Sequence, residues 1–331
     1  MGNKKKKREI MTAKGPIRVG DINKMFPYWE PLEEPVWVPA DPAEHMRPDD
    51  PVLGLLVEGK AFALPWWVMK NHHQANLVLE GQPILVNLCE ACSSAAAFNA
   101  VLDGSRITFR QIRGAFAASY LIMDYKTKSF WAPFLGEALH GPLEGSKLEQ
   151  FPIYHATWAD WKELYPGTVV PNGEGESRDG HGCGDKPGGA HLPGFAKMAK
   201  LDDRLPLTEL VLGVKVNGHS RAYPLTKLHE IGPVLNDSLG GQEIVVLSKS
   251  QTWVAMAFSR NLDGECLEFR VGQDGSPQDS KTNSSWDFAG KSLSGPLANK
   301  ELSFVTSGVE EWFAWAARFP DTEIFDGTSH G

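Results

Sequence analysis

The sequence predicts an α+β protein dominated by strands, made of two homologous lobes that arose by tandem duplication and pack with pseudo-twofold symmetry. Three observations predict this architecture. Short apolar runs joined by turn residues recur along the chain, which is typical of strands and hairpins. Helical spacing is found only near the end of each half. The chain has 331 residues, more than one hydrophobic core usually holds, and the same order of Gly, Pro, Asp and Trp residues occurs in it twice.

The repetition is seen in residues that recur at equal spacing. Residues 52–65 run from a Val to a Pro, and so do residues 211–224. Chance does not align so many Gly, Pro, Asp and Trp residues, so we predict a first repeat lobe over 52–171 and a second over 211–331. Further aligned pairs are Gly81 with Gly241, Asp124 with Asp279, Thr127 with Thr282, Trp131 with Trp286, Trp158 with Trp312, and Trp161 with Trp315.

Each lobe is expected to begin with a hairpin. In the first lobe, residues 52–57 and 61–64 flank a Glu-Gly turn. In the second, residues 211–216 precede an Asn-Gly turn, which is a stronger hairpin signal. The short apolar run at 83–88 then predicts a buried strand, because it is too short for a helix and carries no polar alternation.

A short helix is predicted near the end of each lobe. Residues 158–165 have helical spacing, follow Thr157 as an N-cap, and stop before Pro166. Residues 309–319 repeat this pattern. We interpret the paired tryptophans of these segments as core residues rather than a ligand-stacking box, because large aromatic side chains usually contribute their area to a core.

Two segments lie outside the lobes. Residues 1–51 form a basic tail and a proline-rich arm, in which prolines exclude a long helix and aromatic residues pin the arm onto the body or onto a partner subunit. A homodimer formed through the arm is therefore one expectation. Residues 172–210 are rich in glycine and predict a linker or a lid. They carry His181, Cys183 and His191, and the sequence leaves open whether these reach a site.

Composition excludes several classes of protein. The net charge is −8 and no basic face is visible, so no nucleic-acid binding is expected. No apolar run of about eighteen residues occurs, so no membrane span is expected. Four cysteines are too few for a disulfide scaffold, and the absence of an apolar signal segment favours a cytoplasmic location.

Several motifs follow one another in a characteristic order. They are Tyr223-Pro224-Leu225, His229-Glu230-Ile231, Asn236-Asp237 and Gly240-Gly241 in the second lobe, and Pro65, His72, Asn76, Gly81, Pro83, Cys89, Cys92, Asp124, Thr127, Ser129 and Trp131 in the first. This order resembles the bacterial family known as domain of unknown function 3179, present as two tandem copies. The resemblance covers both lobes and implies a shared fold, but it implies no activity, because the family has none assigned. Glu90 and His73 stand where the family usually has Pro and Glu.

Residues present in one lobe only are where a function is expected to concentrate. Cys89 and Cys92 belong to the first lobe, and the aligned positions of the second hold Lys249 and Thr252. A Cys-x-x-Cys turn can bring two sulfurs onto one metal ion, because the turn places both side chains on the same side. We therefore expect one working site, in the first lobe.

The expected site is a metal centre. We predict that His72, Cys89 and Cys92 are its ligands. His73 is expected to be a fourth ligand or an acid–base group, and Glu90 a proton shuttle. Thiolate and imidazole donors suit one transition metal ion, but they do not distinguish copper, iron and zinc.

These residues predict a metal-dependent enzyme, an oxidoreductase acting on a small molecule held between the lobes. One alternative is a non-catalytic binding or scaffold protein, with a structural zinc or with two merely buried thiols. A second alternative is a dithiol redox protein that uses Cys89 and Cys92. We rank it below the metal site, because a hairpin follows the motif in place of the long helix that often stabilises a thiolate at its N-terminus.

Overall fold

The structure is a computed structural model that describes residues 8–19, 29–179, 186–188 and 201–327. Strands make up 46% of it and helices 9%, so the protein is mostly β and the predicted α+β class is wrong. The helices of the described residues have only one or two turns and form no layer of their own. They are α1 (Trp66–Met69), α2 (Trp158–Leu164), α3 (Leu225–Ile231) and α4 (Trp312–Arg318). None of these helices is long and apolar enough to cross a membrane.

The first half begins with a five-stranded sheet. In sheet order its strands are β16 (Tyr154–Thr157), β4 (Pro51–Val57), β5 (Lys60–Pro65), β17 (Val169–Pro171) and β3 (Trp37–Pro39). β4 and β5 form the hairpin that the sequence predicts at 52–64, which is confirmed. β3 belongs to the proline-rich arm and pairs with β17, so the described part of the arm packs on the body of its own chain.

A four-stranded sheet carries the cysteines. In sheet order its strands are β15 (Gln150–Phe151), β8 (Ser94–Asn99), β7 (Gln82–Cys89) and β6 (Gln74–Leu79). The buried strand predicted at 83–88 is confirmed as part of β7. Because β7 ends at Cys89 and β8 begins at Ser94, the two cysteines lie in one tight turn at the end of this sheet.

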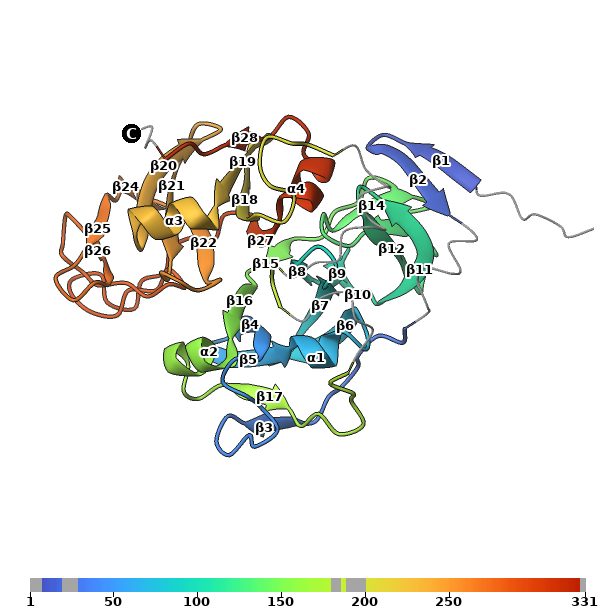
Figure 1. Ribbon diagram of the computed structural model, residues 1–331, viewed down its shortest axis with the longest axis horizontal. Helices are drawn as coiled ribbons and strands as arrows, with labels where there is room; N and C mark the ends of the chain where they lie inside the picture. Colours follow the sequence, from blue (N-terminus) through green and yellow to red (C-terminus); the bar gives the residue numbers. More distant parts are fainter. Residues whose placement is uncertain (1–7, 20–28, 180–185, 189–200, 328–331) are drawn as a thin grey trace, which may run out of the picture.

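A six-stranded antiparallel sheet completes the first half. In sheet order its strands are β1 (Arg8–Thr12), β2 (Gly15–Val19), β11 (Phe109–Phe116), β12 (Ser119–Asp124), β13 (Phe130–Ala132) and β14 (Glu137–His140), and the small ribbon of β9 (Val101–Leu102) and β10 (Ser105–Arg106) precedes β11. The β1–β2 hairpin extends this sheet through β11, at the right of Figure 1. Buried Asp124 fixes the turn after β12, because its carboxylate accepts hydrogen bonds from the backbone N–H groups of Thr127 and Ser129.

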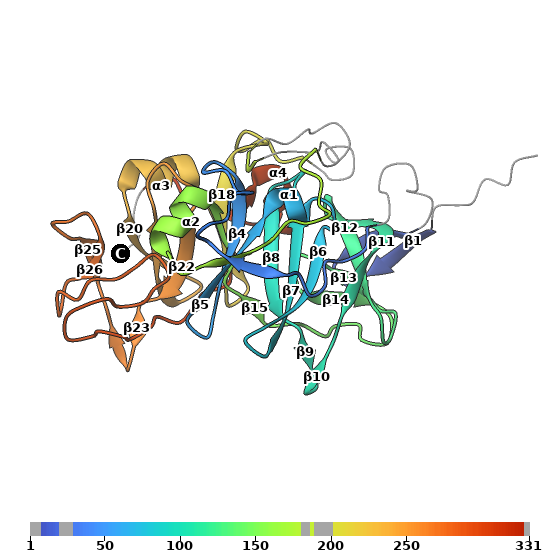
Figure 2. The same ribbon diagram turned by 90° about the horizontal axis from the view of Figure 1, so that it is seen from below.

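The second half, yellow to red in Figure 1, contains smaller sheets. A four-stranded sheet has the order β27 (Ser307–Glu311), β18 (Leu210–Val216), β19 (His219–Pro224) and β28 (Glu323–Ile324). A three-stranded sheet has β20 (Val234–Leu239), β21 (Gln242–Ser248) and β22 (Ala255–Ser259), and two ribbons pair β23 (Asn261–Leu262) with β24 (Glu265–Cys266) and β25 (Phe269–Val271) with β26 (Pro277–Asp279). In both views α4 lies between β18 and the strands β11 and β12 of the six-stranded sheet (Figures 1 and 2).

The two halves are not the equivalent lobes, related by a pseudo-twofold axis, that the sequence predicts. Residues 109–140 join the N-terminal hairpin in a six-stranded sheet, whereas the aligned residues 269–294 form only the two-stranded ribbon of β25 and β26 followed by loops. Individual turns do repeat, since Asp279 accepts the same pair of backbone hydrogen bonds as Asp124. Equal spacing fixes local turn geometry, but the size of a sheet depends on which other strands join it.

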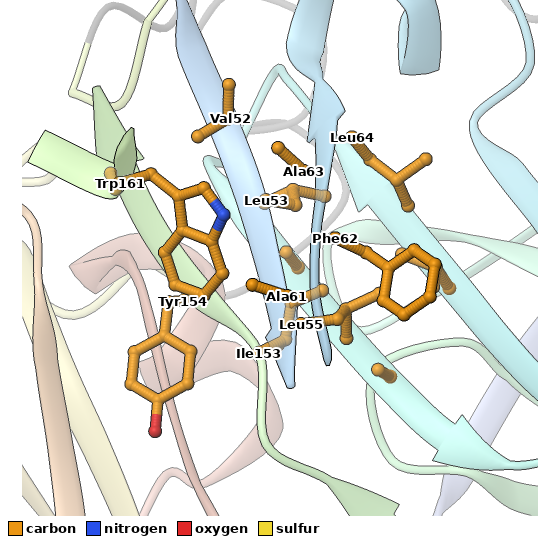
Figure 3. Close-up of a cluster of buried hydrophobic side chains, with 14 of the residues drawn as sticks. Val52, Leu53, Leu55, Ala61, Phe62, Ala63, Leu64, Ile153, Tyr154 and Trp161 are labelled. Atoms are coloured by element: carbon orange, nitrogen blue, oxygen red, sulfur yellow. The ribbon is translucent and has the colours of Figure 1, made fainter. Parts of the chain in front are cut away.

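Tryptophans pack directly on glycines in the cores of both halves, and all four that the sequence assigns to the core are buried. Figure 3 shows the indole ring of Trp161 lying against β4 beside Val52 and Tyr154. A Cβ atom added to Gly54 would lie 2.3 Å from the ring of Trp161, and one added to Gly213 would lie 2.2 Å from the ring of Trp315. Glycine is required at both positions because a close-packed ring occupies the space of a side chain.

Gly54→Ala and Gly213→Ala are each expected to lower the free energy of unfolding by about 1–3 kcal/mol, because the buried rings must shift to admit a methyl group. Urea denaturation followed by tryptophan fluorescence measures this. The control is Gly167→Ala, since no atom lies within 4 Å of a Cβ added there and its backbone is not left-handed. A loss of unfolding free energy no larger than that of the control would contradict the close packing of Trp161 on Gly54 and of Trp315 on Gly213.

Candidate thiol site

The cysteines lie together in the turn between β7 and β8. The backbone N–H of Cys92 donates to the carbonyl of Cys89 at 3.3 Å, which closes the turn. Both are free thiols, with only 2% of Cys89 and none of Cys92 exposed. A buried, closed turn of this kind holds two sulfurs on the same side of the sheet.

The pKa values of the two thiols are shifted in opposite directions. The hydrogen bond to Cys92, burial, and the charges of Cys92 and Glu90 together raise the pKa of Cys89 well above its ordinary value. Burial on its own would raise the pKa of Cys92, but the hydrogen bond from Cys89, the charge of Arg318, and the side chain and backbone of Ser94 outweigh it and lower that pKa. Of the two thiols, Cys92 is therefore the one that loses its proton more readily.

The positive charge comes from the second half of the chain. Arg318, the last residue of α4, forms an ion pair with Glu310 of β27, and only 2% and 9% of these side chains are exposed. Ser94 donates its hydroxyl proton to Glu310 at 2.9 Å. Burial lowers the pKa of Arg318 to about 10, although the negative charges of Cys92 and Cys89 oppose this, so the guanidinium stays charged at neutral pH.

Glu311 of β27 connects the turn that holds Cys89 and Cys92 to the second half of the chain by hydrogen bonds. Its backbone N–H donates to the carbonyl of Cys92 at 3.0 Å, and its carboxylate accepts from the hydroxyl of Ser93 at 2.9 Å. Ser93 has a left-handed backbone (φ 52°), which is strained for a residue with a side chain. The backbone N–H of Gly188 also donates to the Ser93 hydroxyl, at 3.0 Å. Three hydrogen bonds, two with Glu311 and one with Gly188, thus hold the turn.

His73 and Glu90, predicted as acid–base groups, are brought together beside the thiols. Nδ1 of His73 lies 3.2 Å from the Glu90 carboxylate, and both side chains are buried. The Trp29 ring of the arm covers His73 at 4.0 Å between ring centroids. The hydroxyl of Tyr120 donates to the His73 carbonyl at 3.1 Å, and its pKa is raised by burial and by the nearby cysteine and Glu90 charges.

His72, predicted as a metal ligand, is held elsewhere. Its Nδ1 lies 2.8 Å from the carbonyl of Glu30 and its Nε2 lies 2.8 Å from the carboxylate of Glu176. Both ring nitrogens are therefore engaged away from the thiol turn. No three His, Cys, Asp or Glu side chains converge as metal ligands among the described residues. The linker residues His181, Cys183 and His191 lie outside the described residues.

Sequence reasoning missed Glu310, Glu311 and Arg318. These three residues are specific to the second half, whereas the predicted site uses residues specific to the first. With Trp158 aligned to Trp312, these three residues stand opposite Ala156, Thr157 and Leu164. Two carboxylates and a guanidinium in place of two small residues and a leucine indicate a buried charged cluster specific to the second half.

The fold and the site define a mostly β protein with a buried thiol pair flanked by charges. The chain matches the model of the family described as "Protein of unknown function (DUF3179)" over residues 31–322, and it belongs to this family. The match is a single domain that runs through both halves, and it does not show two tandem copies. No curated protein and no solved structure matches the chain.

Proposed function

We propose that this protein is a thiol-based oxidoreductase in which Cys89 and Cys92 cycle between a dithiol and a disulfide. The observation that carries the proposal is the pairing of two buried sulfurs in one turn with the charge of Arg318 beside them. A Cys-x-x-Cys pair with one lowered pKa is the arrangement that thiol–disulfide chemistry requires, because the thiolate is the nucleophile.

The chemistry assigns a role to each thiol. Cys92 attacks as a thiolate, and Cys89 then closes the disulfide by attacking the sulfur of Cys92. Oxidation releases two electrons and two protons to a small acceptor of the peroxide or disulfide class, and two molecules of a thiol reductant reverse it by becoming a disulfide. Glu90 and His73 are positioned to take up the proton that Cys89 loses, because the Glu90 charge reaches this thiol and His73 lies 3.2 Å away.

Geometry favours this proposal over the metal-dependent enzyme that the sequence predicts. The metal site needs His72 together with the cysteines, and both nitrogens of His72 have other partners. The non-catalytic scaffold explains buried thiols, but it gives no reason to bury a charged arginine near them. Redox chemistry at the pair accounts for both features.

The test uses the full chain with Cys183→Ser and Cys266→Ser, so that only the pair remains. We expect oxidation to remove two hydrogens from the mass of the protein, dithiothreitol to restore them, and a redox titration to show one two-electron transition. Cys89→Ser and Cys92→Ser should each abolish that transition. Failure to form the disulfide in any redox buffer, or stoichiometric metal held by the two cysteines, would contradict the proposal.

A further inference from the structure

We infer that the second half of the chain gates the thiol pair: the sulfurs react only when the turn that holds them separates from β27 and α4. This inference rests on the proposed function and names the regulation of its site. Three observations carry it: the burial of both thiols, the kind of contact that joins the turn to the second half, and the energetic cost that this contact carries while it is closed.

Both thiols are out of reach while the turn is in place. None of Cys92 and only 2% of Cys89 is exposed. They share a hydrophobic cluster with Phe313 and Ala314 of α4, so part of their cover comes from the second half. A thiolate must contact the atom that it attacks, so a redox partner of any size needs a movement that uncovers the sulfurs. The reactive form is therefore one in which some of this cover has moved away.

The contact between the turn and the second half consists of a few polar bonds. The backbone N–H of Glu311 donates to the Cys92 carbonyl at 3.0 Å. The hydroxyl of Ser93 donates to Glu311 and that of Ser94 donates to Glu310, each at 2.9 Å. β8, which begins at Ser94, lies beside β27 where the two halves meet (Figure 1), but the two strands belong to different sheets. The two strands can therefore separate without breaking a ladder of backbone hydrogen bonds between them.

Packing between β8 and β27 is incomplete. A cavity of about 40 Å³ is lined by Ala95 and Ala96 of β8 and by Ser307 and Gly308 of β27. Segments with few buried contacts are the ones that open locally in folded proteins. Separation of these strands therefore loses less apolar contact than separation of a filled interface would.

The closed contact also carries a cost that separation relieves. Arg318 is buried beside Glu310, and its Nε and Nη1 have no hydrogen-bond partner among the described residues. Burial lowers the pKa of Arg318 to about 10, so the charged form is penalised at this place. Ser93 keeps a left-handed backbone (φ 52°), which adds strain. Water that enters the open contact satisfies the guanidinium nitrogens, which brings the open form closer in free energy to the closed one.

Gating controls the reactivity of a buried dithiol. In the closed form the pair is protected from thiol reagents and oxidants. The rate of its chemistry then depends on the fraction of molecules that are open, because only these bind or react.

The experiment labels the reduced full chain that carries Cys183→Ser and Cys266→Ser with excess iodoacetamide at constant pH. Mass spectrometry counts the alkylated sulfurs over time. We expect the pair to react about 100-fold or more slowly in the folded protein than in urea, because only the open fraction reacts. Ser93→Ala removes the hydroxyl bonded to Glu311 and leaves every charge in place, so it should raise the labelling rate of the folded protein about 10-fold.

The matched control is Ser284→Ala. Ser284 is a buried serine in the loop after β26, and its hydroxyl accepts from the backbone N–H of Leu297 at 3.0 Å. Its loss removes a buried hydrogen bond of the second half without touching the turn, so it should change the labelling rate far less than Ser93→Ala. A second measurement needs no variant. In residue-resolved hydrogen exchange, the amide of Glu311 should exchange faster than the amides of the β4–β5 hairpin.

Three results would overturn the inference and leave the dithiol function standing, provided that the redox titration shows the disulfide. They are labelling as fast in the folded protein as in urea, equal acceleration by Ser93→Ala and Ser284→Ala, and exchange of the Glu311 amide as slow as that of the hairpin. The second result would mean that only unfolding of the whole chain exposes the thiols. Faster labelling of Ser93→Ala in a chain that forms no disulfide in any redox buffer would support the gate and overturn the proposed function.

Discussion

Replacing Glu310 by alanine is expected to destabilise the protein by about 3–5 kcal/mol, the loss typical of removing one partner of a buried ion pair. Glu310 neutralises Arg318, and only 9% and 2% of the two side chains are exposed. Ser94 loses its acceptor at the same time. The free energy of unfolding in urea at neutral pH measures the effect.

Two variants control this result. Lys249→Ala removes an ion pair with Asp160 and Glu163 in which Lys249 is 22% exposed and Glu163 72%, so a change of about 1 kcal/mol or less is expected. The double variant Glu310→Leu with Arg318→Met removes both buried charges and should recover most of the loss, because no unpaired charge remains. If Glu310→Ala proves as mild as Lys249→Ala, the buried pair does not stabilise the contact between the halves.

The same substitution also tests the electrostatic link to the thiols. Without Glu310, the charge of Arg318 is balanced mainly by the Cys92 thiolate. The pKa of Cys92 is therefore expected to fall further below its ordinary value. The ultraviolet absorbance of the thiolate as a function of pH measures this, with Cys92→Ser as the blank.

Local features of the fold could be predicted from the sequence because they depend on neighbouring residues. The hairpin at 52–64 and the buried strand at 83–88 follow from turn residues and short apolar runs, and both are confirmed. The fold class could not be predicted in the same way. Equal spacing of Asp124 and Asp279 fixes equivalent turns, but the β1–β2 hairpin that enlarges one sheet pairs across about 95 residues, and nothing local reveals it.

For the candidate site, too, only the local part could be predicted from the sequence. The spacing of Cys89 and Cys92 places them in one turn, whatever the rest of the fold. His72 and His73 are adjacent in the chain, yet the left-handed backbone of His73 (φ 62°) directs the two rings to different partners. Arg318 follows Cys92 by more than two hundred residues, and only tertiary packing brings its charge to the sulfur.

Acidification is expected to destabilise the protein through His155, by about 3 kcal/mol between pH 6.5 and pH 4. His155 lies on β16, fully buried against the Trp66 ring at 5.7 Å. Burial lowers its pKa from 6.5 to about 4, and the nearby backbone of Val309 offsets only part of that effect. Each unit of difference from the unfolded chain corresponds to about 1.4 kcal/mol.

The sign follows from proton binding. Between pH 6.5 and pH 4 the unfolded chain carries a proton on His155 and the folded chain does not, so stability is complete above pH 6.5 and decreases as the pH falls through this window. His155→Phe keeps a buried ring but cannot bind the proton, so its unfolding free energy should decrease less over the same range. His140→Phe, at a half-exposed histidine, should retain the full decrease. Parallel curves for His155→Phe and the unmutated protein would show that another buried group takes up the proton.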